Sequence, residues 1–128
     1  MTKPTITSDN PVWEQNASVE FLIPERCHII ETFNSAADAS LSIARARVEP
    51  GVTTAWHAVE GTIERSIIAD GHARVEIGDC PARDVGPGDV VVIPAGIRQR
   101  ITNTGERDLI FYCVCTPRFQ SINYRALE

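Results

Sequence analysis

Short apolar runs, separated by glycine and proline at regular intervals, dominate the chain. The turn residues fall at Pro50-Gly51, Asp70-Gly71, Gly78-Asp79, Gly86-Pro87-Gly88, Pro94-Ala95-Gly96 and Thr104-Gly105. The runs between them are rich in Val, Ile and Thr, and helical periodicity is weak throughout. Many short strands with turn residues between them predict an all-β sandwich or barrel.

Individual strands can be predicted from this pattern. Residues 38–48 (DASLSIARARV) alternate in the way that a strand does. Residues 65–69 and 73–77 flank Asp70-Gly71, a dipeptide typical of hairpin turns, so we expect these two strands to pair. Residues 90–93 and 109–115 are apolar on both faces, which indicates central strands. Pro94 should end the first of them, because proline cannot donate to a ladder.

The two ends of the chain look peripheral. Residues 1–16 form a polar N-terminal arm with Trp13 as its one apolar anchor. Residues 117–128 form a C-terminal segment, in which the stretch 119–128 (FQSINYRALE) predicts a short helix with Tyr124 and Leu127 on one side. The length of 128 residues indicates one domain, residues 1–128.

Composition narrows the class of protein. The net charge of −5 argues against nucleic acid and anionic membrane surfaces as partners. There is no apolar run of the ~18 residues that a membrane span needs, and the N-terminal residues lack the apolar core of a signal peptide. We therefore expect a cytoplasmic protein. The four cysteines show no zinc spacing, so we expect Cys27, Cys80, Cys113 and Cys115 to be small buried hydrophobes.

Two spaced motifs lie between Gly51 and Asn103. The first, over residues 51–71, has Gly51, His57, Val59, Glu64 and Gly71 at intervals of five, one, four and six residues. The second, over residues 88–103, places Gly88, Pro94, Gly96, Gln99 and Asn103 at intervals of five, one, two and three.

These motifs resemble the paired signature of the cupin superfamily, G-x5-H-x-H-x3,4-E-x6-G followed by G-x5-P-x-G-x2-H-x3-N. Eight of its ten specified positions match, and Val59 and Gln99 stand where the family usually carries histidine. The resemblance implies an antiparallel jelly-roll β-barrel. It also implies a homodimer, since terminal segments of small cupins often pack on a partner subunit.

The resemblance also implies a metal site at the mouth of the barrel. Carried over residue by residue, the ligands are His57, Glu64 and Gln99, which would hold Zn, Ni, Mn or Fe more weakly than a three-histidine site. Because residues two apart on a strand face the same way, we expect Ser66, Thr53, Ala55, Val59 and Ile101 to line the ligand cavity. Ser66 replaces a common aromatic, so the cavity should be wide.

Several functions stay open at this point. The first is a metal-dependent isomerase, epimerase or lyase acting on a sugar derivative or a hydroxy or oxo acid, with His57 or Glu64 moving protons. In metal-free cupin epimerases a histidine acts as base with a tyrosine, but neither Tyr112 nor Tyr124 can be placed in the cavity from the sequence. The second is a non-catalytic binding cupin without metal, in which Glu64 accepts hydrogen bonds from Gln99 or His57. A dioxygenase is the third.

Other polar residues near the motifs have no assigned role. Arg98 and Arg100 face away from Gln99 on a regular strand, so we expect them to be solvated or paired with acids. Glu31 and Asn34 resemble a polar cluster of small cupins but cannot be placed from spacing. His28 and His72 are expected at the surface.

Overall fold

The computed structural model describes residues 6–15 and 19–128. These residues form eleven strands and one 3₁₀ turn. The larger sheet has the order β1-β2-β3-β10-β5-β8, with bounds Phe21–Ile23, Cys27–Ser35, Asp38–Val48, Leu109–Thr116, Ile63–Asp70 and Val90–Ile93. The smaller sheet has the order β11-β4-β9-β6-β7, with bounds Tyr124–Ala126, His57–Val59, Gln99–Asn103, Ala73–Ile77 and Arg83–Val85.

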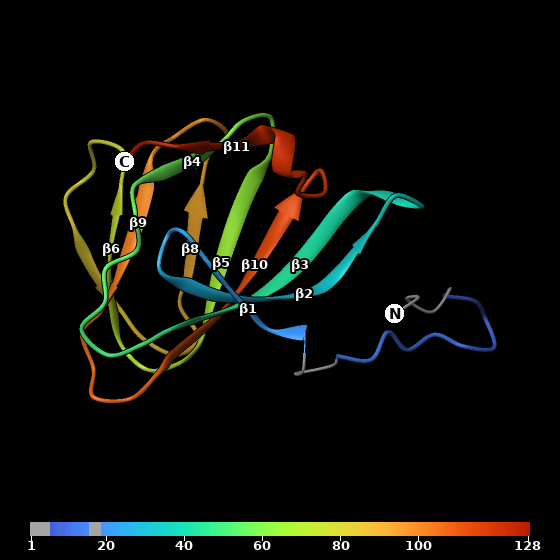
Figure 1. The fold of residues 1–128 in the computed structure, drawn as a ribbon, viewed down its shortest axis with the longest axis horizontal. Helices are drawn as coiled ribbons and strands as arrows, with labels where there is room; N and C mark the ends of the chain where they lie inside the picture. Colours follow the sequence, from blue (N-terminus) through green and yellow to red (C-terminus); the bar gives the residue numbers. More distant parts are fainter. Residues whose placement is uncertain (1–5, 16–18) are drawn as a thin grey trace.

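The two sheets face each other across the core and give an antiparallel jelly roll (Figure 1). Every strand pair is antiparallel, for example His57 of β4 opposite Gln99 of β9. In the described part of the chain no ladder joins the sheets into one closed barrel. The predicted fold class is confirmed, and β3 has the bounds that its alternation predicted.

The predicted hairpin at Asp70-Gly71 is wrong. β5 pairs with β10 and β8 in the larger sheet, whereas β6 pairs with β9 and β7 in the smaller one. The turn is therefore a corner at which the chain crosses between sheets. Gly71 is suited to it because its φ is 89° and a Cβ would lie 3.2 Å from the Leu109 Cα.

The prediction that residues 90–93 form a central strand is also wrong. β8 lies at the edge of the larger sheet, with Val91 and Ile93 buried but Val90 and Val92 exposed by 55% and 58%. β10, in contrast, is central, as predicted, between β3 and β5. β8 ends at Ile93, directly before Pro94, as expected.

Inward-facing side chains from both sheets form the apolar core. Val48 and Leu109 are completely buried, and Ile68 is 1% exposed. The buried cluster consists of Cys27, Ala46, Val48, Ile68, Ala73, Val75, Val91, Ile93, Ile101, Leu109 and Phe111. Most of this core lies toward the end of the molecule where β10 begins and β5 and β9 end, and Ile93, which lies opposite Glu64, extends it toward the other end.

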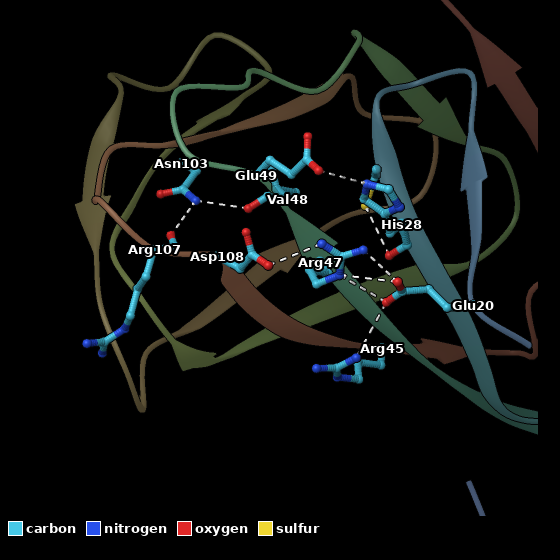
Figure 2. A network of polar contacts seen from close by, with 10 residues as sticks. Glu20, His28, Arg45, Arg47, Val48, Glu49, Asn103, Arg107 and Asp108 are labelled. Atoms are coloured by element: carbon cyan, nitrogen blue, oxygen red, sulfur yellow. Dashed lines mark hydrogen bonds and ion pairs between the residues drawn. The ribbon is translucent and has the colours of Figure 1, made fainter. Parts of the chain in front are cut away.

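Asn103, the last residue of the second motif, binds through its side chain to three backbone groups at the end where β10 begins. Its side-chain amide donates to the carbonyls of Val48 and Arg107 at 2.9 and 2.8 Å (Figure 2). Its Oδ1 accepts the Gly105 N–H at 2.9 Å. Because Asn103 is only 1% exposed and all these groups are paired, the residue holds a buried turn in place.

A charged network on the outside of β3 holds the β1–β2 hairpin. Arg47 contacts Glu20 at 2.6 Å and Asp108 at 3.1 Å, and Arg45 lies 3.5 Å from Glu20 (Figure 2). The hydrogen bond from Arg47 lowers the pKa of Glu20. Since Glu20 directly precedes β1, these contacts anchor the hairpin whose turn reaches the site described below.

The peripheral segments differ in part from expectation. Residues 119–128 form a 3₁₀ turn (Ser121–Asn123) followed by β11, instead of one helix carrying Tyr124 and Leu127. Trp13 packs edge-on against Phe33 at a centroid distance of 4.9 Å, while residues 1–5 and 16 of the arm lie outside the described residues.

The cysteines and histidines follow the expectations only in part. All four thiols are free; Cys27 and Cys115 are buried and Cys113 is half-buried, but Cys80 is exposed, so the expectation of burial is wrong for Cys80. It lies in the turn after β6, which no other element covers. His72 is exposed as expected. Among the described residues, no helix has the length and apolar character to cross a membrane.

Candidate functional site

The two motifs meet between the sheets, at the end opposite the apolar core. β4 carries His57, β9 carries Gln99 directly opposite it, and β5 carries Glu64 on the other sheet. All three are 8–9% exposed. The amide of Gln99 donates to Glu64 Oε1 across the gap at 3.5 Å. The structure therefore brings the three residues chosen from the sequence together.

Glu64 is a buried carboxyl group held by neutral donors. Ser66, two residues further along β5, donates its hydroxyl to Glu64 Oε2 at 3.2 Å. Burial raises the pKa of Glu64; the nearby His57 opposes this rise and the charge of Glu25 adds to it. The environment thus shifts Glu64 toward its protonated form.

His57 is oriented by two acceptors on the same nitrogen. Its Nδ1 lies 2.8 Å from the Ala55 carbonyl oxygen and 2.8 Å from Glu25 Oε2. A carbonyl oxygen can only accept, so Nδ1 must carry a proton, and in the neutral ring Nε2 is left with the free lone pair. Nε2 is therefore the atom of His57 that can take up or release a proton.

The electrostatics around His57 favour the charged ring. Burial works against the imidazolium, but the hydrogen bond and the charge of Glu25 outweigh it, and the Ala55 carbonyl and Glu64 add to them. As a result the pKa of His57 lies above its ordinary value. This is the environment of a histidine that acts as both acid and base.

Tyr124 completes the cluster from the C-terminal strand. β11 pairs with β4 so that Tyr124 lies opposite Val59, and the Tyr124 ring stacks on His57 with centroids 5.4 Å apart and planes 18° apart. Its hydroxyl lies 3.4 Å from Glu25 Oε2. Burial, followed by the charge of Glu25, raises the pKa of Tyr124, which keeps the phenol protonated.

The position of Glu25 follows from the turn between β1 and β2. The Arg26 N–H donates to the Ile23 carbonyl at 3.0 Å, with Pro24 and Glu25 as the central residues, and proline favours the second position of such turns. The Glu25 carbonyl accepts the Ala55 N–H at 3.0 Å, and Arg26 donates to the Thr53 carbonyl at 2.8 Å. These contacts dock the turn on the segment that leads into β4 and His57.

Sequence comparison identifies the family. The sequence model of the Cupin domain matches residues 44–115, more than half of the chain, and this range contains both motifs. The chain is a cupin. No curated protein matches it in sequence.

The solved structures to which this cupin is similar share little of its sequence, so they inform the fold alone. KdgF from Halomonas sp. superposes with a TM-score of 0.70 at 16% identity, over 80% of this chain and 91% of that one. The nucleoside dehydratase Pac13 gives 0.73 at 13% identity, over 91% and 92%. A predicted oxalate decarboxylase from Thermotoga maritima gives 0.70 at 22%, over 81% and 98%.

The other residues expected to line the cavity of this cupin fall into different places. Ser66 contacts Glu64, and Ala55 takes part through its carbonyl. Thr53 does not reach the cluster: its hydroxyl pairs with that of Thr102 at 2.8 Å, because a bridge joins the two residues. Ile101 packs in the apolar core. Val59 is buried beside His57 on β4.

The side chains next to Glu64 are small. Cys113 and Ala44 are paired across β10 and β3 on the inward face, yet both are only half-buried. Ser66 lies opposite Cys113 on β5. That serine at this position widens the cavity stays a prediction.

The cluster is a poor donor set for a divalent metal. Gln99 presents its amide N–H to Glu64, and Glu64 has a raised pKa and two neutral donors. His57 could offer only Nε2 to a metal, because its Nδ1 is held by Glu25. Within residues 6–15 and 19–128, no three His, Cys, Asp or Glu side chains form a group that fits a metal ion. These residues meet one another's hydrogen-bonding requirements, so the mechanism proposed below uses no metal.

Sequence reasoning missed Glu25 and left Tyr124 unplaced. Both lie outside the motifs, at 32 and 67 positions from His57 in the printed sequence. Pro24 indicates a turn in the sequence, but no local pattern predicts which distant segment that turn contacts. The arginines behave as expected: Arg98 pairs with Asp79 and Arg100 with Glu76, and both guanidinium groups stack on Trp56 at 4.5 and 4.4 Å.

Asn34 and Glu31 are also placed by the structure, away from this cluster. The Asn34 amide donates to Glu31 at 2.8 Å and to the Phe119 carbonyl at 2.8 Å, while Arg118 donates to Asn34 Oδ1 at 2.9 Å. These contacts tie β2 to the segment after β10. His28 pairs with Glu49 at 3.7 Å.

Proposed function

We propose that this cupin is an enzyme that moves a proton on a small, uncharged, hydroxyl-bearing substrate, with His57 as the acid–base group. The proposal rests on one observation: His57 Nδ1 contacts both the Glu25 carboxylate and the Ala55 carbonyl oxygen. It leaves Nε2 as the single reactive position of a buried ring and stabilises the charge that the ring acquires.

The reaction follows from these protonation states. Neutral His57 removes a proton from a carbon next to a carbonyl group through Nε2, and the resulting imidazolium is stabilised by Glu25. The same nitrogen then returns the proton, either to a departing hydroxyl, which leaves as water, or to a neighbouring carbon. The first route is a dehydration and the second an isomerisation.

Glu64 and Tyr124 have supporting roles in this proposal. Because its pKa is raised, a protonated Glu64 can donate a hydrogen bond to the substrate oxygen on which negative charge develops. Tyr124 stacks on His57 and binds Glu25, so it restrains both partners of the ion pair. Gln99 and Ser66 hold Glu64 in place.

The charges of the site favour an uncharged substrate over an acid. Glu25 is buried beside His57, and its carboxylate would repel an anion that entered the site. The arginines at this end are engaged elsewhere: Arg125 pairs with Glu60 at 2.9 Å and Arg26 with Glu128 at 3.6 Å. A sugar or nucleoside derivative fits better than a hydroxy or oxo acid.

The structural neighbours supply substrates to try. Pac13 is a nucleoside dehydratase, and two of its variants have been solved with uridine, at TM-scores of 0.73 and 0.74 to this chain. The Thermotoga maritima neighbour is a predicted oxalate decarboxylase. Uridine-type and oxalate-type ligands therefore represent the uncharged and the acidic alternatives.

Deuterium exchange tests the proposal without knowledge of the complete reaction. The protein is incubated in D₂O with carbonyl derivatives of sugars and nucleosides and with hydroxy and oxo acids, and mass spectrometry follows deuterium incorporation. We expect exchange in an uncharged compound, reduced by about 10²–10⁴-fold in His57→Gln. His72→Gln, which alters an exposed histidine, is the matched control and should behave like the wild type.

A non-catalytic binding cupin is the second candidate. It is favoured by Val59, which stands where the family usually has histidine, and by the closed hydrogen-bond set of Glu64, Ser66 and Gln99. Uridine binding that shifts the His57 resonance, with no exchange in any compound, would support this candidate instead.

Metal analysis separates the metal-dependent alternative from both. Zn, Ni, Mn or Fe at His57, Glu64 and Gln99 would appear as stoichiometric metal in protein purified without chelator. Loss of that metal in His57→Ala and Glu64→Ala would overturn the metal-independent mechanism proposed here.

A further inference from the structure

The turn that brings Glu25 to His57 contains a residue in a strained backbone conformation. Residues 24–26 connect the paired ends of β1 and β2 as a three-residue hairpin loop. The last residue of such a loop commonly takes a left-handed conformation, which glycine adopts most easily. Here that residue is Arg26, with a φ of 69°, and it is the one non-glycine residue of the described chain with a positive φ. Arginine at this position costs conformational energy that glycine would not.

The Arg26 side chain makes two contacts beyond its own turn. Its Nε donates to the Thr53 carbonyl at 2.8 Å, and its Nη2 lies 3.6 Å from Glu128 Oε1. The ion pair is weakened by water, because 52% of the arginine side chain is exposed, so the bond to Thr53 is the stronger contact. Glycine, the residue that the backbone favours, could make neither contact.

These contacts attach the turn at two points to the segment that leads into β4. The Glu25 carbonyl accepts the Ala55 N–H at 3.0 Å, and Arg26 bonds to Thr53, two residues earlier. A single bond would let the turn rotate about it, whereas two bonds fix its orientation. In this orientation the Glu25 carboxylate contacts His57 Nδ1 at 2.8 Å.

Glu128 extends this attachment to the residue next to His57. Its Oε2 accepts the Trp56 N–H, while its Oε1 faces Arg26. Trp56 directly precedes His57 in the chain. Arg26 is therefore linked to the backbone that carries the histidine and to the loop that carries its carboxylate partner.

We propose that Arg26 is a positioning residue for the acid–base histidine: its side chain fastens the β1–β2 turn to the segment before β4, so that Glu25 stays on His57 Nδ1. The proposal rests on the function proposed above, in which Nε2 is the reactive atom because Nδ1 is held. Without the Arg26 side chain the turn detaches more often. The ring then loses the group that fixes its tautomer and stabilises its charge.

Histidine NMR on Arg26→Gly tests the proposal. Glycine suits this backbone conformation, so the variant removes the side chain without distorting the turn. The ¹⁵N shifts of the ring report its tautomer, and their titration gives the pKa of His57. We expect that pKa to fall by at least ~0.5 and the neutral ring to carry its proton on Nδ1 less often. Arg107→Gly, which removes an exposed, ion-paired arginine from a turn at the other end of the molecule, is the matched control and should behave like the wild type.

Two further variants complete this test. Arg26→Lys keeps a cationic N–H donor and should restore most of the wild-type pKa of His57. If Arg26→Gly does not fold, Arg26→Asn takes its place, because asparagine tolerates the left-handed conformation and is too short to replace the bond to Thr53. A wild-type pKa and tautomer of His57 in the folded glycine or asparagine variant would overturn the proposal.

The role of Arg26 and the proposed function can fail separately. If the wild type catalyses deuterium exchange, Arg26→Gly should lower kcat by about 10-fold and leave KM nearly unchanged, since the groups that contact the substrate remain. Absence of exchange in every compound would overturn the proposed function. The NMR comparison needs no substrate, so it would still decide whether Arg26 positions Glu25 on His57.

Discussion

The space between the sheets has an apolar end and a polar end, although the same strands line both. β5 contributes Ile68 to the first and Glu64 to the second, and β9 contributes Ile101 and Gln99. At the apolar end, Leu109 and Val48 are fully buried in a packed cluster. At the polar end, three titratable residues, Glu25, His57 and Glu64, are buried to nearly the same degree.

The two ends have opposite effects on stability. Each buried apolar side chain stabilises the fold by about 1.5–3 kcal/mol, whereas each buried polar group loses hydration that only its hydrogen bonds offset. The polar end makes those hydrogen bonds within one small cluster. The apolar end therefore holds the fold, and the polar end carries the candidate chemistry. Four changes test this division.

Leu109→Ala should have the largest effect. It leaves a cavity in the apolar end, where the packed neighbours cannot collapse, so the free energy of unfolding should fall by about 2–5 kcal/mol. Urea denaturation measures it. Ile122→Ala, at a residue 87% exposed, should change it by less than ~0.5 kcal/mol. Equal effects at both positions would contradict the assignment of the core.

Glu25→Gln should lower the pKa of His57, because the hydrogen bond and charge of Glu25 are what raise it. Below that pKa the charged ring then loses its partner, so stability should fall by about 1.5–3 kcal/mol in acid and less at high pH. Histidine NMR titration measures the pKa directly. An unchanged titration of His57 would show that Glu25 does not act on it.

Glu64→Gln should have a smaller effect, of the opposite sign at neutral pH. Because burial raises the pKa of Glu64 above 4.5, its contribution to stability is fully present below pH 4.5 and is lost as the pH rises through the raised value. The glutamine variant should lose less stability between acid and neutral pH than the wild type. Urea unfolding over this range shows it. A wild-type curve no steeper than that of the variant would mean that Glu64 ionises normally.

Tyr124→Phe should have the smallest effect. It removes one long hydrogen bond to Glu25 and keeps the ring stacked on His57, so the loss should be about 0.5–1.5 kcal/mol. Tyr112→Phe on the outer face of β10 provides the comparison. If Tyr124→Phe cost as much as Leu109→Ala, the polar end would be part of the stabilising core.

The sequence predicted those parts of the site that local spacing controls. His57, Glu64 and Gln99 were found because their spacing from glycines in the chain resembles the two cupin motifs. The same reasoning failed for β8, since a run of four apolar residues is compatible both with a central strand and with an edge strand. It also failed for Asp70-Gly71, because a two-residue turn can join paired strands or cross between sheets.

By itself, the amino-acid sequence determined the strand rhythm, the fold family and the three residues of the motifs. Only the tertiary structure decided that Glu25 and Tyr124 flank His57, and that Val90 and Val92 lie outside. The physical reason is that alternation and turn chemistry act between neighbours in the chain. The docking of the β1–β2 turn and the pairing of β11 with β4 depend instead on hydrogen bonds between segments far apart in sequence.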